Sequence, residues 1–454
     1  SAAQLGQSIA VDGSGNVYVA GYSNATWGAP MQAFGGNYDA FAAKLNSTTG
    51  ALIWNTFLGG SGMDYSTAIA VDGSGNVYVA GYSSATWGSP VQAYSGNQDA
   101  FAAKLNSAGA LQWNTFLGGS GADYVYSIVV DGNGNVYVAG YSFATWGTPA
   151  QAFGGGTNDA FAAKLDSAGA LTWNTFLGGS GNDQINAITV DGGGNVYVAG
   201  NSTVTWGAPM QAHSGNWDAF AAKLNPATGA LIWSTFLGGS GDDLPHSLIV
   251  NDANELIVLG TTGSANFPTT TGALQSAFGG GTAFSPQGIG TTYPNGTDMI
   301  VSRLSASGAQ LLASTYVGGS ANDGINSAVA LKYNYADEMR GEVEVTATGN
   351  ILVASCTQST NFPVTAGAYQ MAIGGGTHDA VLFEFDPSLS TLVWSTYFGG
   401  SGADAAYSLE QDSGGNIFIA GGTTSTNLPV TPGTVGQSNN GGQADAFVAS
   451  FSPN

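Results

Sequence analysis

One phrase returns at a nearly constant spacing along the chain, and this repetition constrains the fold more than any other feature. VDGSGNVYVAG occupies Val11–Gly21 and recurs at Val71–Gly81. Five further, progressively edited copies begin at Val130, Val190, Val250, Val345 and Gln411. Seven copies, the first five about sixty residues apart, predict a protein built by repeating one structural unit, as in a solenoid or a propeller.

Each repeat carries four strand signals. In the first repeat, SIAVD (Ser8–Asp12) and NVYVAGY (Asn16–Tyr22) flank an Asp-Gly-x-Gly turn, which is typical of a β-hairpin. DAFAAKL (Asp39–Leu45) alternates large apolar with small or polar residues, and ALIWNTFL (Ala51–Leu58) follows after a short turn. Four antiparallel strands in each of seven repeats predict an all-β fold, a single seven-bladed β-propeller. A β-solenoid is the alternative, but its rungs are far shorter than this repeat.

The expected domain is one propeller over residues 1–454, and two of its blades are irregular. Its blades are expected at approximately 1–60, 61–119, 120–179, 180–239, 240–319, 320–400 and 401–454. Blade five has a long insertion between its second and third strands. Blade six has a charged insertion that contains Lys332, Asp337, Glu338, Arg340 and Glu342. The sequence leaves open whether this insertion precedes or interrupts the first strand of the blade.

The count of strand signals is uneven at the seventh blade. Seven first, second and third strands can be counted but only six fourth strands, so this blade is expected to lack its outermost strand. Three explanations remain open: the blade has three strands, an upstream segment was cut away, or another chain supplies the strand. In the last case DAFVASF is an exposed edge for β-augmentation and head-to-tail assembly. Its candidate assembly residues are Asp445, Phe447 and Phe451.

Composition limits the partners. The net charge is −22 with only 7 Lys and Arg residues, which excludes nucleic acid and disfavours anionic membranes. No apolar run reaches the ~20 residues of a membrane-spanning helix, and Cys356 is the single cysteine, so no intrachain disulfide forms. Few Lys with abundant Gly, Ser, Thr and Asn suggest an extracellular or cell-surface location.

The repeat resembles a known family. The hairpin pattern D-x-x-G-N-x-Y-V-x-G, the strand DAFAAKL and the strand followed by Gly-Gly, as in WNTFLGG, are similar to SBBP β-propeller repeats, and the resemblance covers essentially the whole chain. It implies an extracytoplasmic or cell-surface setting, often within larger proteins. It implies no reaction, because the family is defined by its scaffold.

Comparison of the copies separates the faces of the fourth strand. One position is Ile53, Gln112, Thr172 and Ile232 in blades one to four, so that face is expected to be solvated. The next position is tryptophan in five blades, which we interpret as core between blades: Trp54, Trp113, Trp173, Trp233 and Trp394. Blade five has Ala313 there, so its packing must differ.

Repeated aspartates follow the Gly-Gly-Ser turns and open the third strands. The first set is Asp64, Asp123, Asp183, Asp243, Asp323 and Asp404; the second is Asp39, Asp99, Asp159, Asp218, Asp298, Asp379 and Asp445. The structural interpretation is that each carboxylate accepts backbone N–H groups of a glycine-rich turn. The functional interpretation is Ca2+, whose ligands are carboxylate and carbonyl oxygens. No cofactor is required on either interpretation.

The loops between second and third strands carry a Trp-Gly pair in blades one to four. Connectivity places these loops and the fourth-to-first loops at one end of the blades, the candidate binding face. The tryptophans are Trp27, Trp87, Trp146 and Trp206. One interpretation is that each indole packs its loop onto its own blade. The other is a multivalent lectin, in which exposed indoles stack on sugars and nearby carboxylates bind the sugar hydroxyls. The candidate carboxylates are Asp64, Asp123, Asp183 and Asp243.

Signals for catalysis are weak. His213, His246 and His378 stand at non-equivalent positions and are expected in loops, and no nucleophile–base pair or zinc spacing is visible. Paired carboxylates for glycoside cleavage stay possible. We therefore expect a non-catalytic extracellular structural or adhesive protein that contacts itself or other surface proteins. A glycan-binding lectin is the first alternative and a secreted enzyme the second.

Overall fold

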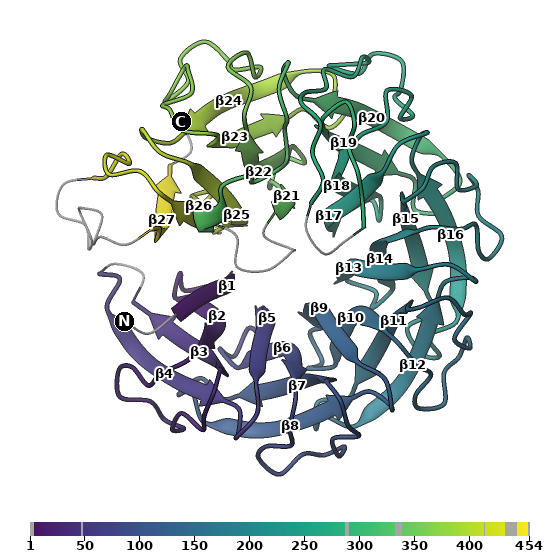
Figure 1. The fold of residues 1–454 in the computed structure, drawn as a ribbon, viewed down its shortest axis with the longest axis vertical. Helices are drawn as coiled ribbons and strands as arrows, with labels where there is room; N and C mark the ends of the chain where they lie inside the picture. Colours follow the sequence, from purple (N-terminus) through teal and green to yellow (C-terminus); the bar gives the residue numbers. More distant parts are fainter. Residues whose placement is uncertain are drawn as a thin grey trace. The chain divides into compact units, whose positions relative to one another are not determined.

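The computed structural model of the protein describes residues 4–46, 49–286, 290–331, 338–412, 414–431 and 443–452. The fold is a seven-bladed β-propeller of antiparallel blades, as the repeat predicted (Figure 1). Within the described residues, six sheets have four strands and one has three. The described residues also contain one short 3-10 turn, η1 (Val329–Leu331).

Each blade is one meander of consecutive strands. Blade one comprises β1 (Gln4–Val11), β2 (Val17–Ser23), β3 (Asp39–Leu45) and β4 (Leu52–Leu58). Blade two comprises β5 (Asp64–Val71), β6 (Val77–Ser83), β7 (Asp99–Leu105) and β8 (Leu111–Leu117). Blade three comprises β9 (Asp123–Val130), β10 (Val136–Ser142), β11 (Asp159–Leu165) and β12 (Leu171–Leu177). Blade four comprises β13 (Asp183–Val190), β14 (Val196–Ser202), β15 (Asp218–Leu224) and β16 (Leu231–Leu237).

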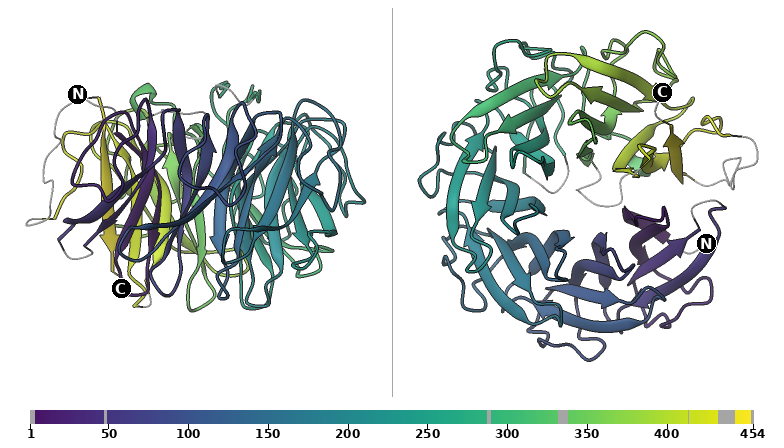
Figure 2. Two further views of the ribbon diagram at one scale, coloured as in Figure 1. Left: turned by 90° about the horizontal axis from the view of Figure 1, so that it is seen from below. Right: turned by 180° about the vertical axis from the view of Figure 1, so that it is seen from behind.

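The remaining blades follow the same order. Blade five comprises β17 (Asp243–Val250), β18 (Leu256–Thr262), β19 (Asp298–Leu304) and β20 (Leu311–Val317). Blade six comprises β21 (Glu342–Val345), β22 (Ile351–Thr357), β23 (Asp379–Phe385) and β24 (Leu392–Phe398). Blade seven comprises β25 (Asp404–Gln411), β26 (Ile417–Thr423) and β27 (Asp445–Phe451). Seen from the side, the strands of a blade run up and down with loops at both ends (Figure 2).

In the described residues, the first two strands meet at a bulge in every blade except blade six. In blade two, Asp64 pairs with Ser83, and the register shifts between Ser66 and Ala68. A Cβ atom on Gly81, beside the bulge, would lie 1.9 Å from the carbonyl oxygen of Tyr65. This close backbone approach requires glycine, which explains why the repeated phrase ends in glycine in the bulged blades, whereas blade six, without the bulge, has Ser355 there.

The chain divides into two compact units, and the boundary runs through blade four. One unit is Ser1–Ala208 with Ala222–Ile232, and the other is Pro209–Ala221 with Trp233–Asn454. Inside the first unit, β1, β5, β9 and β13 are neighbours from blade to blade. The first strand of each blade is therefore the inner one and the fourth strand the outer one.

The predicted packing of tryptophans between blades is confirmed for blades one to three, although Trp113 is only half-buried, as are Trp233 and Trp394. Trp54 of blade one donates its indole N–H to the carbonyl oxygen of Ser107 in blade two, at 3.1 Å. Trp113 contacts Ser167 and Trp173 contacts Pro226 in the same way, at 3.1 and 3.0 Å. At the neighbouring position, Ile53 and Ile232 are 50% and 52% exposed, as expected for the solvated face.

The insertion of blade six interrupts the first strand. Asp323 still bridges to Thr357, as Asp64 pairs with Ser83, but regular pairing resumes only at Glu342 with Ala354. Lys332 and Asp337 lie outside the described residues. The described part of the insertion is not a solvated hairpin, because Leu331 and Glu338 are buried and the Leu331 carbonyl accepts a hydrogen bond from Tyr407 of blade seven.

Candidate functional site

The loop between the second and third strands lies along the outer edge of its own blade. In blade one, the N–H of Met31 donates to the carbonyl of Asn55 at 2.8 Å, and Phe57 N–H donates to Gln32 at 3.2 Å. The Asn55 side chain donates to the carbonyl of Trp27 at 2.8 Å. Equivalent bonds to the fourth strand start from Val91, Ala150, Met210, Thr270 and Thr365. These loops cover the edge strands, which would otherwise offer unpaired backbone groups.

The Trp-Gly residues hold these loops in place. Trp87 lies edge-on to Phe101 of its own blade, with ring centroids 5.3 Å apart, and Trp27 and Trp146 repeat the arrangement. Trp87, Trp146 and Trp206 are each 4% exposed, whereas Trp27 is half-buried. A sugar could stack on the three buried indoles only if the loops lifted, so this geometry matches the plug interpretation. Ligand binding by these residues stays a prediction.

The two aspartate sets meet in pairs where one blade joins the next. Asp39 of blade one and Asp64 of blade two lie on the two sides of Gly59, where a Cβ atom would be 2.6 Å from Asp64 Oδ2 and 2.9 Å from Asp39 Cγ. Asp39 accepts the N–H of Gly35 at 2.5 Å. Asp64 accepts the N–H of Gly60 at 3.0 Å and the hydroxyl of Ser83. The carboxylates thereby fasten two glycine-rich loops to the strands.

The same pairing recurs at later junctions. Asp123, Asp183 and Asp243 accept the N–H groups of Gly119, Gly179 and Gly239 at 3.0, 3.0 and 2.8 Å. All three carboxylates are buried. Their partners from the preceding third strands are Asp99, Asp159 and Asp218, each of which adds electrostatic repulsion.

Burial gives these carboxyls unusual acidities. Desolvation is the main cause and repulsion from the neighbouring carboxylate a smaller one; together, against the hydrogen bonds that lower it, they raise the pKa of Asp123, Asp183 and Asp243 to about 7 in each case. The pKa of Asp39 is raised to about 6 for the same reasons, burial first and the charge of Asp64 second. In mildly acidic solution these buried carboxyls therefore keep protons that an exposed aspartate has already lost.

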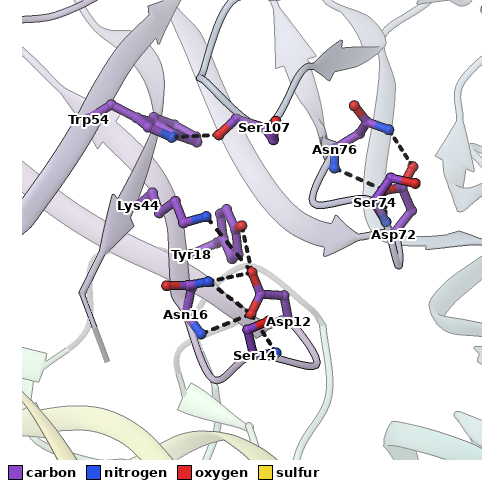
Figure 3. Close-up of polar contacts among 10 residues, drawn as sticks. All are labelled: Asp12, Ser14, Asn16, Tyr18, Lys44, Trp54, Asp72, Ser74, Asn76 and Ser107. Atoms are coloured by element: carbon purple, nitrogen blue, oxygen red, sulfur yellow. Dashed lines mark hydrogen bonds and ion pairs between the residues drawn. The ribbon is translucent and has the colours of Figure 1, made fainter. Parts of the chain in front are cut away.

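A third kind of aspartate shapes the turn of the inner hairpin (Figure 3). Asp12 accepts hydrogen bonds from the N–H groups of Ser14 and Asn16 at 3.0 and 2.9 Å, and from Tyr18 at 2.9 Å. The Nζ atom of Lys44 lies 3.8 Å from Oδ2 of Asp12. Burial alone would raise the pKa of Asp12, but the hydrogen bonds outweigh burial and lower it. The same turn in blade two is built on Asp72 and Asn76.

The aspartates for which Ca2+ binding is predicted accept hydrogen bonds within the protein, Asp39 from Gly35 and Asp64 from Gly60 and Ser83. The turn aspartate Asp12, which is not in those sets, is also engaged. Oδ1 of Asp12 receives two backbone N–H groups and the Asn16 amide, and Oδ2 receives Asn16 and Tyr18. In the part of the chain that the structure describes, no group of three or more His, Cys, Asp or Glu side chains converges as a metal centre. Ca2+ binding stays a prediction.

One histidine lies in a strand, contrary to the prediction, and another lies at the end of a loop, as predicted. His246 lies inside β17 with Nε2 2.6 Å from Thr261 Oγ1, and burial lowers its pKa to about 3. His378 precedes β23 and is 0% exposed, with Nδ1 3.0 Å from Thr377 Oγ1. His246 is therefore neutral at physiological pH and packs as part of blade five.

Two of the predicted edge residues, Phe447 and Phe451, belong to an aromatic cluster that the sequence did not reveal, and Phe447 is buried in it. Phe398 of β24 lies 5.5 Å, centroid to centroid, from both Phe447 and Phe451. Tyr369 lies 6.1 Å from Phe451 and is 64% exposed. Asp445 opens β27 and pairs with Thr423 of β26. The structure therefore brings Phe447 and Phe451 together with Phe398 of blade six, whereas the Trp-Gly loops stay distributed, one to a blade.

The repeats match a known family. The family model for the SBBP β-propeller repeat matches residues 1–26, 53–86, 112–143, 172–205 and 393–429. The chain carries SBBP β-propeller repeats. The SBBP matches include the fourth strand, the Gly-Gly turn with its aspartate and the inner hairpin. They stop just before Trp27, Trp87, Trp146 and Trp206, so the match to the SBBP repeat implies nothing about the Trp-Gly loops.

Other similarities of this SBBP-repeat chain are distant. Regulatory protein FlaEY of Caulobacter vibrioides is 27% identical over 180 residues, which are 37% of this chain and 18% of that protein. A polysaccharide lyase, an ulvan lyase, has a TM-score of 0.46 at 13% identity, over 89% of this chain and 87% of its own. A europium-containing methanol dehydrogenase has a TM-score of 0.38 at 10% identity, over 85% and 79%. The activities of such distant proteins have no bearing on this chain.

Among the described residues, helices of the length and apolarity needed to cross a bilayer do not occur.

Proposed function

We propose that this SBBP-repeat chain is a non-catalytic structural or adhesive module, extracellular or at the cell surface, that contacts copies of itself or partner proteins. The observation that carries the proposal is the outer edge of blade seven. In the described part of the chain, β27 has a strand partner on one side only. Val448 in its middle is 55% exposed, whereas Ala42, at the same position of blade one, is 0% exposed. An exposed edge strand is a site for pairing with another chain.

The outer loops offer a second contact surface. The loop position that bonds to the fourth strand exposes an apolar side chain in blades one, two and four: Met31 is 58%, Val91 49% and Met210 55% exposed. Repeated exposed apolar groups are typical of interaction surfaces. Because each blade presents the same position, weak single contacts would add up when several blades engage one partner.

The repeated polar residues support a scaffold role. The carboxylates of Asp64 and Asp123 hold backbone N–H groups of turns, and that of Asp12 closes a hairpin. An enzyme needs reactive groups that converge on one substrate. Here the same arrangement is repeated from blade to blade, as expected for residues that maintain a scaffold.

The decisive experiment measures assembly. Light scattering after size exclusion, with negative-stain electron microscopy over a concentration series, should show oligomers or fibres of the full chain. Val448→Lys, which puts a charge on the edge, should shift the protein to monomer. Val329→Lys is the control, because Val329 is 82% exposed but lies in η1. A chain that stays monomeric at high concentration and retains no surface partner contradicts the proposal.

Glycan binding is the second candidate, and one observation favours it: Trp27 is only half-buried. A glycan array with the full chain and with Trp27→Ala tests this alternative. Binding that disappears in Trp27→Ala supports a lectin, and binding that persists places the glycan elsewhere.

A further inference from the structure

A row of tyrosine rings runs across blades one to three, at the end of the strands from which the long loops emerge. Tyr22 of β2 lies 4.7 Å from Tyr65 of β5, measured between ring centroids. Tyr65 lies 5.1 Å from Tyr82 of β6, and Tyr82 lies 4.9 Å from Tyr124 of β9. Tyr141 of β10 follows at 5.1 Å from Tyr124. These five residues, the tyrosine row, lie in the first compact unit on neighbouring strands (Figure 1).

Part of the tyrosine row is accessible from outside the protein. Tyr65 and Tyr124 are half-buried, and two exposed apolar side chains lie beside the row. Met63, whose sulfur is 3.5 Å from the Tyr65 hydroxyl, is 46% exposed. Phe143, whose ring centroid is 5.7 Å from that of Tyr141, is 42% exposed. The loop end of blades one to three thus offers aromatic surface that continues from one blade to the next.

The fold of a blade does not require these tyrosines, as a comparison with blade four shows. Tyr65 opposes Tyr82 in blade two, whereas Gln184 opposes Asn201 at the same register of blade four. The second strands are otherwise identical, VYVAGYS and VYVAGNS, and both hairpins carry the same bulge. Because the same hairpin forms with two amides, packing within the blade does not account for the tyrosine row, which favours a role in binding.

In the described part of blades one to three, the loop end carries no exposed charged side chain. The lysines of these blades lie at the opposite end of the strands, where each contacts a tyrosine ring near the start of a second strand: Lys44, Lys104 and Lys164. The aspartates at the loop end are each 0% exposed: Asp39, Asp64, Asp99, Asp123 and Asp159. The other aspartates lie in the short turns at the opposite end. Burial raises the pKa of Tyr65 and Tyr124 above the ordinary value, so their hydroxyls are neutral at physiological pH.

We propose that the tyrosine row binds an uncharged carbohydrate chain. A sugar ring has apolar C–H faces and a polar edge of hydroxyl groups, and tyrosine matches both with its flat ring and its hydroxyl tip. Several rings in a row let a linear chain make several weak contacts at once. A protein partner is usually oriented by charged groups, which the described surface here lacks. The inference goes beyond the proposed function, because it depends neither on β27 nor on Trp27.

The test begins with an array of neutral and acidic linear glycans probed with the full chain, and continues with calorimetric titration of the tightest neutral oligosaccharide. Tyr65→Gln with Tyr82→Asn gives blade two the pair that blade four has, and should weaken binding about tenfold or more. Tyr65→Phe with Tyr82→Phe keeps the rings and should bind within about threefold of wild type. Trp27→Ala is the control for the Trp-Gly loops and should bind as wild type does. Circular dichroism and Tm check the folding of each variant.

Chemical modification locates the site. N-acetylimidazole acetylates accessible tyrosine hydroxyls, and mass spectrometry identifies the modified residues. The bound oligosaccharide should protect Tyr65 and Tyr124, whereas Tyr369 of blade six, which is 64% exposed, should stay reactive.

Three results would overturn the inference. The first is that no neutral glycan binds, which would leave the tyrosine row to a protein partner. The second is that acidic glycans bind equally well. The third is that Tyr65→Gln with Tyr82→Asn binds as wild type does, and loss of binding in Trp27→Ala alone would then assign the glycan to the Trp-Gly loop. Assembly is measured separately on the same variants, so failure of this inference leaves the proposed function standing.

Discussion

Leu389 fills the space that Ala313 leaves where blade five meets blade six. Ala313 stands at the tryptophan position, since it opposes Arg303 as Trp54 opposes Lys44. Leu389 stands at the turn position that is glycine in other blades, with φ +57°. Both side chains are buried in one apolar cluster. At the other junctions the pair is reversed in size: Trp54 with Gly109, Trp113 with Gly169, Trp173 with Gly229 and Trp233 with Gly308.

This relationship predicts strong coupling between the two positions. Leu389→Gly removes a buried side chain and should cost roughly 2–4 kcal/mol of unfolding free energy, less the relief of a left-handed leucine. Ala313→Trp should cost roughly 1–3 kcal/mol through overpacking. The double variant restores the Trp–Gly pair and should be more stable than the sum of the single effects by about 1–3 kcal/mol. Denaturant unfolding measures all four proteins.

A matched cycle uses the junction of blades four and five. Gly308→Leu alone should be destabilising, because a Cβ atom there would lie 2.6 Å from Trp233 Cδ2. Trp233→Ala with Gly308→Leu should recover part of the loss. Strict additivity in both cycles would contradict the idea that the residues fill one shared space.

The paired carboxyls predict that stability falls from mildly acidic to alkaline pH. The pKa of Asp123 is raised by burial to about 7 in the folded protein, against about 3.9 in an unfolded chain. A group whose pKa is higher in the folded than in the unfolded state stabilises the fold fully below the unfolded pKa. This stabilisation is lost as the pH rises through the folded pKa, and each unit of pKa difference corresponds to about 1.4 kcal/mol. Tm should therefore drop between pH 5 and pH 8, with Asp183 and Asp243 adding to the effect.

Two asparagine variants separate the kinds of aspartate. Asp123→Asn removes one raised pKa, so its Tm should fall less than that of wild type from pH 5 to pH 8. Asp131 is the matched control, because burial is outweighed by hydrogen bonds from Asn135, Asn133 and Tyr137 that lower its pKa. Asp131→Asn should have a lower Tm at every pH in this range but the same slope as wild type. Identical slopes for both variants and wild type would exclude the paired carboxyls as the cause.

Replacing a Trp-Gly tryptophan with alanine should loosen the loop that covers the outer strand of its blade, and the effect should grow with the burial of the indole. Trp87→Ala removes a side chain that is 4% exposed and should cost roughly 3–5 kcal/mol. Trp27→Ala should cost less, since Trp27 is half-buried. Hydrogen exchange should accelerate in the loop around Val91, whose N–H bonds to Asn114. Unchanged exchange in Trp87→Ala would show that the backbone bonds alone hold the loop.

If the outer loops contact a partner, replacing their exposed apolar side chains should weaken binding to that partner without changing the stability of the fold. Replacing Met31, Val91 and Met210 together with Gln should weaken adhesion to a partner surface at least tenfold and leave Tm within a few degrees, because these side chains are exposed. A solid-phase binding assay with the purified partner measures the effect. Gln112→Ala, which changes an exposed polar position of β8, is the control. Full adhesion by the triple variant would restrict the contact to blade seven.

Strand order, blade number and the tryptophan core were predictable, because each depends on a pattern repeated several times within one chain. Trp54, Trp113 and Trp173 were recognisable as core by comparison with the tolerant position beside them. The partnership of Asp39 with Asp64 was not, since the two residues open different strands in different blades and nothing in their spacing indicates contact. Burial of the Trp-Gly indoles was equally unpredictable, because the same loop sequence is compatible with an exposed indole and with a buried one.

The sequence by itself determined the seven-fold repetition and the four-stranded blade, because alternating apolar residues and glycine-rich turns act locally and recur. Only the tertiary structure decided which side chains meet across a junction: Asp39 with Asp64, and Leu389 in one cluster with Ala313. The physical reason is that these contacts depend on packing between blades, where distance along the chain no longer indicates distance in space.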